Sequence, residues 1–258
     1  MNDVPAVTTS PRRGFFRLLG GILISPRDTF TYLRDHGGRA WLLVAALLLF
    51  LSSLPPLVGG PVQARETRQQ IMENLENQPG MPTDMDVEQI AALTASPIFT
   101  TIIPTVGAVL ALLFSWLVWS GALYLLAAMT GGRGSFGQLL PVVVWATLPY
   151  GLRSLAQTIY IATTGSLIDT PGLSGFVQSE SADPFTLPST ETAVLESLLG
   201  QVEIYLFWYL ALLVIGLMAV MQLSKRKALG LVITVWAIFL LFRLLGTVVS
   251  NSLAGGFM

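Results

Sequence analysis

Three charged residues and one amide interrupt apolar stretches that are otherwise suited to crossing a membrane. They are Arg153, Gln157, Glu203 and Arg243. At ~1.5 Å per helical residue, both arginines fall ~21 to 23 Å into a ~30 Å apolar core, and Glu203 opens its own stretch near the same depth. An unpaired charge at the centre of such a core costs about 2.5 to 3.5 kcal/mol or more. We therefore expect Glu203 to contact at least one of the two arginines.

Two kinds of chemistry fit this intramembrane cluster. An ion pair would join three spans, and the arginine side chains would extend toward the nearer interface to keep their charges hydrated. Alternatively, the arginines would form a site for an anion or a lipid headgroup beneath the outer surface. Gln157 would add a polar group in either case, because it follows Arg153 by about one turn on the same helix face.

A second group of candidate residues is the run Gly131, Gly132, Arg133 and Gly134, which separates two apolar stretches. Glycines supply the left-handed backbone that ends one helix, and Ser135 can cap the next, so the run predicts a tight helical hairpin. Its backbone amides and Arg133 could bind a phosphate or a lipid headgroup. The simpler interpretation is a turn that carries one positive charge.

Residues for catalysis, cofactors or metals are not evident. The chain lacks cysteine, has the single histidine His36, and contains neither a His-Glu-x-x-His nor a Gly-x-x-x-x-Gly-Lys sequence. These absences argue against thiol chemistry, a histidine-rich metal site and a phosphate-binding loop. We expect no enzymatic activity, no cofactor and no metal, and the net charge of -1 gives no reason to expect nucleic-acid binding.

The elements that must position these residues are membrane helices. Hydrophobic residues make up 53% of the chain and charged residues 11%, a balance suited to lipid rather than to one water-facing domain. The sequence predicts an all-α polytopic bundle, in which Pro149 kinks the third span. The five expected spans are about 41–58, 104–129, 139–163, 203–223 and 228–250.

The remaining segments are polar. Residues 1–40 form an N-terminal tail in which Ser25-Pro26-Arg27-Asp28 has the pattern of a helix start, predicting a short interfacial helix before the membrane. The acidic segments 61–97 and 165–200 are expected as outside loops, the first with a helix from Arg65 and the second with a helix from about Ser189. Residues 251–258 form an outside tail.

Charge asymmetry predicts the orientation. Ten of the 14 basic residues precede the first span or lie in the two short linkers: Arg12, Arg13, Arg17, Arg27, Arg34, Arg39, Arg133, Lys225, Arg226 and Lys227. By the positive-inside rule the N-terminus is cytoplasmic and the C-terminus lies outside the cell membrane. Lys225 to Lys227 could also contact anionic lipid.

Several of these motifs together resemble a known family. Leu23 to Phe30 reads Leu-Ile-Ser-Pro-Arg-Asp-Thr-Phe, Gly131 to Gln138 reads Gly-Gly-Arg-Gly-Ser-Phe-Gly-Gln, and Pro149 ends an Ala-Thr-Leu-Pro sequence. This pattern, over most of 22–245, resembles the bacterial branch of the Yip family of five-span membrane proteins. Eukaryotic members are associated with Rab GTPases, but their Asp-Leu-Tyr-Gly-Pro string is absent here.

The resemblance implies an integral membrane protein without an established activity. Together with the lack of catalytic residues, it favours a non-enzymatic protein that organises membrane lipid or partner proteins, a second copy of the chain included. The alternative is a subunit of an oligomeric transporter or channel, since five spans make a poor solitary transporter.

Overall fold

Five long helices dominate the computed structural model, which describes residues 14–36, 38–76, 87–168, 170–177 and 189–255. Within these residues every regular element is helical, and five helical stretches are long and apolar enough to cross a membrane. The expected all-α bundle with five spans is therefore confirmed. The spans contain α3 (Ala40–Glu76), α5 (Ile103–Met129), α6 (Phe136–Ala146) with α7 (Leu148–Thr164), α9 (Ile204–Met221) and α10 (Lys225–Gly255).

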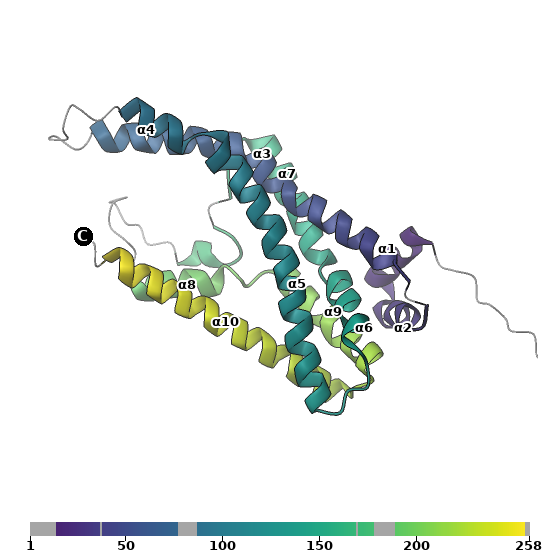
Figure 1. Cartoon of the computed structure of the whole chain (residues 1–258). Coiled ribbons are helices and arrows are strands. Elements are labelled where there is room, and N and C mark those ends of the chain that lie inside the picture. The colour runs from purple at the N-terminus through teal and green to yellow at the C-terminus, as the bar shows by residue number, and fades with distance from the viewer. Residues whose placement is uncertain (1–13, 37, 77–86, 169, 178–188, 256–258) are drawn as a thin grey trace, which may run out of the picture.

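The bundle has two unlike ends (Figure 1). The turn end holds the hairpin at Gly131–Gly134, the linker before α10, and the N-terminal helices α1 (Phe15–Ile24) and α2 (Pro26–His36). The loop end, at the other side of the molecule, holds four short elements: α4 (Val87–Thr94), the π-helix η1 (Ile98–Ile102), the 3-10 helix η2 (Ser174–Phe176) and α8 (Thr190–Leu199). At the turn end α5 and α10 lie close together, and they diverge toward the loop end.

The first span is longer than the sequence predicts. Helix α3 continues through Pro55, Pro56 and Pro61 to Glu76, where a break near residue 58 was expected. Membrane helices tolerate proline, and the polar residues after Pro61 are good helix formers, so the helix has no reason to stop there. Gly60 allows η1 to pack closely against this helix, because a Cβ at this position would collide with the side chain of Thr101.

The third span is interrupted at Thr147, between α6 and α7. Pro149 lies in the first turn of α7, as expected for a residue that ends the preceding hydrogen-bond pattern. Thr147 stabilises the break: its hydroxyl donates to the carbonyl of Val143 at 2.8 Å and accepts the indole N–H of Trp116 at 3.0 Å. The kink expected from Pro149 is thus present and is attached to α5.

Tight packing is concentrated in the half of the bundle near the turn end. Leu139, Val143 and Trp145 of α6 and Leu213 and Leu217 of α9 are fully buried there. Because α9 carries Gly216 at the crossing point, α6 can approach until a Cβ there would collide with Val142. This half is therefore closed by side chains.

The helix that follows Ser25 does not simply lie at the membrane interface. Phe30 of α2 is fully buried, and its ring would lie 3.4 Å from a Cβ at Gly216. Arg34 donates to the carbonyl of Ala219 at 2.9 Å and so satisfies the C-terminal end of α9. Helix α1 instead keeps the exposed apolar side chains of an interfacial helix, with Phe16 and Ile24 on its surface.

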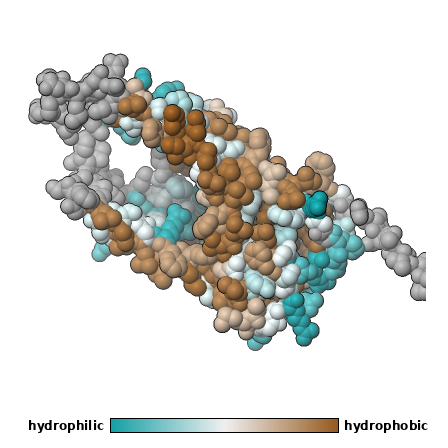
Figure 2. All heavy atoms as spheres, in the orientation of Figure 1, coloured by the Kyte–Doolittle hydropathy of each residue, from teal (hydrophilic) through white to brown (hydrophobic). Residues whose placement is uncertain are grey.

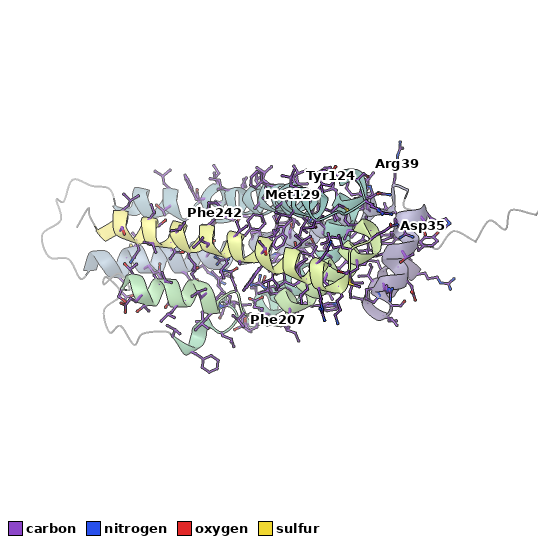
Figure 3. The ribbon with its side chains drawn as sticks, turned by 90° about the horizontal axis from the view of Figure 1, so that it is seen from below. Asp35, Arg39, Tyr124, Met129, Phe207 and Phe242 are labelled. Atoms are coloured by element: carbon purple, nitrogen blue, oxygen red, sulfur yellow. The ribbon has the colours of Figure 1, made fainter. Side chains whose placement is uncertain are left out.

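The outside of the bundle is apolar. Figure 2 shows hydrophobic residues over the visible faces of α5 and α10, and hydrophilic residues gathered near the turn end. Phe207 of α9 and Phe242 of α10 are exposed on the surface, whereas Asp35 and Arg39 lie at the turn end (Figure 3). This distribution is that of a helix bundle whose sides face lipid.

Candidate functional site

The intramembrane cluster contains a two-point ion pair. Arg153 extends from the second turn of α7, and Glu203 immediately precedes α9. The guanidinium Nε lies 2.5 Å from Oε2 of Glu203, and Nη2 lies 2.7 Å from Oε1. The Glu203 side chain is only 14% exposed, so the pair is partly removed from solvent, where charge-assisted hydrogen bonds are strong. It joins the third and fourth spans.

Arg243 of α10 does not share this carboxylate. Among the described residues Glu203 pairs with Arg153 alone, and Arg243 makes no ion pair. Gln157, one turn beyond Arg153 on α7, lies near the arginines but outside the pair. The structure therefore brings Arg153, Gln157 and Arg243 to one region, and Glu203 is connected to it through its ion pair with Arg153.

That region is a cavity of about 590 Å³, which we call the central cavity. All five spans contribute to its wall, for example through Leu48 of α3, Leu112 of α5, Tyr150 of α7, Leu206 of α9 and Phe239 of α10. Arg153, Gln157 and Arg243 line it as well. Its size falls within the ~300 to 1,000 Å³ that small-molecule sites occupy.

Hydrogen-bond donors outnumber acceptors on this wall. The side chains of Gln157, Tyr150, Tyr209 and Arg243 have no hydrogen-bond partner among the described residues, and the buried indole N–H of Trp236 has none either. The hydroxyls of Ser52 and Ser154 are occupied, because they donate to carbonyls of their own helices. No aspartate or glutamate of the described chain lines the cavity. The wall thus has a positive charge and unused donors.

A second, more open cavity of about 450 Å³ lies nearer the loop end. Arg153 and Gln157 line both cavities, and Glu203 lines only the second. The Arg153–Glu203 pair therefore forms part of the wall between them.

The glycine-rich turn, the other expected site, is tied to the ends of α9 and α10. Gly131 has a φ of +90°, the left-handed conformation that glycine adopts without strain. The backbone N–H of Gly132 donates to Ala127 at 2.8 Å, and that of Arg133 donates to Met221 at 3.2 Å. These amides bind carbonyls of the chain itself. Lys227 adds a further bond at 2.9 Å to the carbonyl of Thr130, at the end of α5.

Two further positions of the turn require glycine, because atoms of neighbouring residues lie too close to them for a side chain. A Cβ at Gly132 would lie 2.9 Å from the carbonyl oxygen of Ala127, and one at Gly134 would collide with the sulfur of Met221. The Arg133 side chain remains exposed. A headgroup at this turn would therefore meet the guanidinium of Arg133 rather than a ring of free amides.

The sequence of the chain matches a known family of membrane proteins. The Yip1 domain matches residues 20–245, which is most of the chain. The chain belongs to the Yip1 family. It is 25% identical over 242 residues to "Membrane protein YknW" of Bacillus subtilis (strain 168), a match that covers 92% of each chain. No solved structure matches it. The resemblance to a bacterial Yip protein is confirmed, and the chain is a multi-pass membrane protein.

In this Yip1 protein the matched region contains the turn and the central cavity. Sequence reasoning named Arg153, Gln157, Glu203 and Arg243 but missed Tyr150, Tyr209 and Trp236. A signal for one of these was present: Tyr150, Arg153, Ser154 and Gln157 follow the i, i+3, i+4, i+7 spacing of a single polar face on a membrane helix. The described part of the Yip1 chain contains no group of three or more His, Cys, Asp or Glu residues placed for a metal ion.

Proposed function

We propose that this Yip1-family chain is a non-enzymatic membrane protein that binds and organises membrane lipid through the central cavity. The observation that carries the proposal is the composition of the cavity wall. Apolar side chains of α3, α5, α9 and α10 line it, together with polar groups that include Arg153 and Gln157 of α7 and Arg243 of α10. A ligand with an apolar chain and a polar head matches both parts.

The non-catalytic part of the proposal rests on the family and on the residues available. The polar groups in the cavity are arginine, glutamine, serine, threonine, tyrosine and tryptophan, and the cavity has no carboxylate, histidine or cysteine among its lining residues. Such groups bind and orient a ligand, whereas general acid–base catalysis usually draws on the absent types.

The orientation is also part of the proposal. Arg34, Arg133 and Lys227 lie at the turn end, and Glu191 and Glu196 of α8 lie at the loop end. The positive-inside rule then makes the turn end cytoplasmic and opens the cavity in the outer half of the cell membrane. The lipid would enter from the outer leaflet.

Filling the cavity tests the lipid-binding function. Ala108 of α5 lines the central cavity, so Ala108→Phe should occupy it and lower the amount of lipid that remains with the purified protein, measured by extraction and mass spectrometry. Val106→Phe is the matched control, because Val106 is 52% exposed on the outside of the same helix. Equal lipid content in the two variants and the natural protein would contradict the proposal.

One observation favours the alternative of a transporter or channel subunit. The Arg153–Glu203 pair lies between two cavities, as a gate would. The buried side chains of α6 and α9 fill the half near the turn end in the described part of the chain, so a passage would need a second copy. Flux of radiolabelled solutes into liposomes that contain the purified protein tests this: lipid binding alone predicts no flux above that of empty liposomes.

A further inference from the structure

The central cavity has one positive charge in excess. Two arginines contribute to its wall, and Glu203 neutralises only Arg153, through both guanidinium bonds described above. Arg243 keeps its charge without an ion-pair partner among the described residues. It lies 18 residues after the start of α10 at Lys225, ~27 Å along the helix, within the apolar part of the span. A membrane protein rarely retains such a charge without function.

The neutral polar side chains of the cavity would also bind a ligand that accepts hydrogen bonds. Gln157 of α7, Tyr150 of α7 and Tyr209 of α9 line the cavity with no bonded acceptor among the described residues. An anion with several oxygen atoms would accept from a guanidinium and from neutral donors together.

The apolar side chains of the cavity wall favour an amphiphilic ligand over a free anion. Leu112 of α5 and Phe239 of α10 line the cavity, and these two helices diverge toward the loop end (Figure 1). The outer faces of these helices are apolar (Figure 2). An acyl chain would therefore meet apolar side chains both in the cavity and on the outer faces of α5 and α10. A small hydrated ion would gain nothing from this wall.

The geometry points to a binding site for the phosphate of an anionic phospholipid, in which Arg243 binds the phosphate and Gln157 donates a hydrogen bond to it. This inference rests on the proposed lipid-binding function and specifies its ligand. The Arg153–Glu203 pair shapes the wall and leaves the recognition of charge to Arg243.

The test uses the full chain, delipidated in neutral detergent, with two probes: phosphatidylglycerol and diacylglycerol, which has no phosphate. Phosphatidylglycerol should raise the melting temperature more than diacylglycerol does, because a ligand stabilises the state that binds it. Arg243→Gln should weaken phosphatidylglycerol binding by about tenfold or more, the loss expected for a charge-assisted hydrogen bond, and should leave diacylglycerol binding unchanged. Arg226→Gln at the turn end is the matched control and should change neither.

The lipid-free variant gives an independent measurement. If Arg243 is held for a ligand, Arg243→Gln removes an uncompensated charge and should raise the melting temperature of the lipid-free protein. A lower melting temperature would show instead that Arg243 has a structural partner, and would overturn the inference. A second variant, Gln157→Leu, should also weaken phosphatidylglycerol binding selectively.

The outcomes separate the inference from the proposed function. Equal binding of both lipids by the natural protein would overturn phosphate recognition and leave lipid binding intact. Binding of neither lipid would overturn both. Displacement of phosphatidylglycerol by millimolar inorganic phosphate would identify a free anion as the ligand and overturn the phospholipid assignment.

Discussion

At the scale of single residues, the Arg153–Glu203 pair illustrates how a membrane protein accommodates charged side chains. Two parallel N–H···O bonds fix both side chains, and Glu203 is largely withdrawn from solvent. Either charge alone would be costly at this depth, so the two are stable only together. The pair also links the kinked third span to the start of α9.

Removing the carboxylate should therefore destabilise the protein. We expect Glu203→Gln to lower the free energy of unfolding by about 1–3 kcal/mol, because Arg153 would remain without its counter-charge. Arg153→Gln added to Glu203→Gln should restore part of the loss, whereas Arg243→Gln should not show this coupling. Thermal unfolding in detergent measures these effects as a double-mutant cycle, with Glu191→Gln on the exposed surface of α8 as the control. Additive losses for Glu203 and Arg153 would show that the pair contributes nothing.

At the scale of helices, hydropathy predicted the five spans, and the glycine cluster predicted the hairpin, because both depend on local composition. The full extent of α3 was not predicted, since proline is a strong signal for a break in water and a weak one in a membrane helix. The docking of α2 was not predicted either. It depends on Phe30 reaching a space beside Gly216, a residue 186 positions later in the chain, and local patterns do not contain such contacts.

Gly216 should accordingly be the most sensitive glycine of the spans near the turn end. Gly216→Ala places a methyl group where Val142 and the ring of Phe30 already lie, and we expect a loss of about 1–3 kcal/mol from overpacking. Gly230→Ala is the matched control, because a Cβ at Gly230 of α10 has no neighbour within 4 Å. It should be neutral or slightly stabilising, as glycine is unfavourable inside a helix. Equal melting temperatures for the two variants would contradict the close packing of α6 and α9.

At the scale of the whole molecule, the two halves of the bundle differ in packing. The half near the turn end is filled by α2, α6 and α9, whereas the other half contains the central cavity between diverging helices. The polar residues of the cavity wall could be recognised in the sequence. The cavity itself could not, because its volume depends on the angle between α5 and α10. At the turn end these two helices are joined by the hydrogen bond from Lys227 of α10 to the carbonyl of Thr130, at the end of α5.

The charges at the two ends predict how this asymmetric bundle lies in the membrane. Ser224 and Ser252 are exposed near opposite ends of α10, and Ser135 is exposed at the turn end. The natural chain has no cysteine, so a single cysteine at each position can be labelled without background. Because basic residues concentrate at the turn end, a membrane-impermeant thiol reagent applied to intact cells should label Ser252→Cys. It should reach Ser135→Cys and Ser224→Cys only after the cells are opened. Labelling of Ser224→Cys and Ser252→Cys from the same side would mean that α10 does not cross the membrane, and the central cavity could not then open to the outer leaflet.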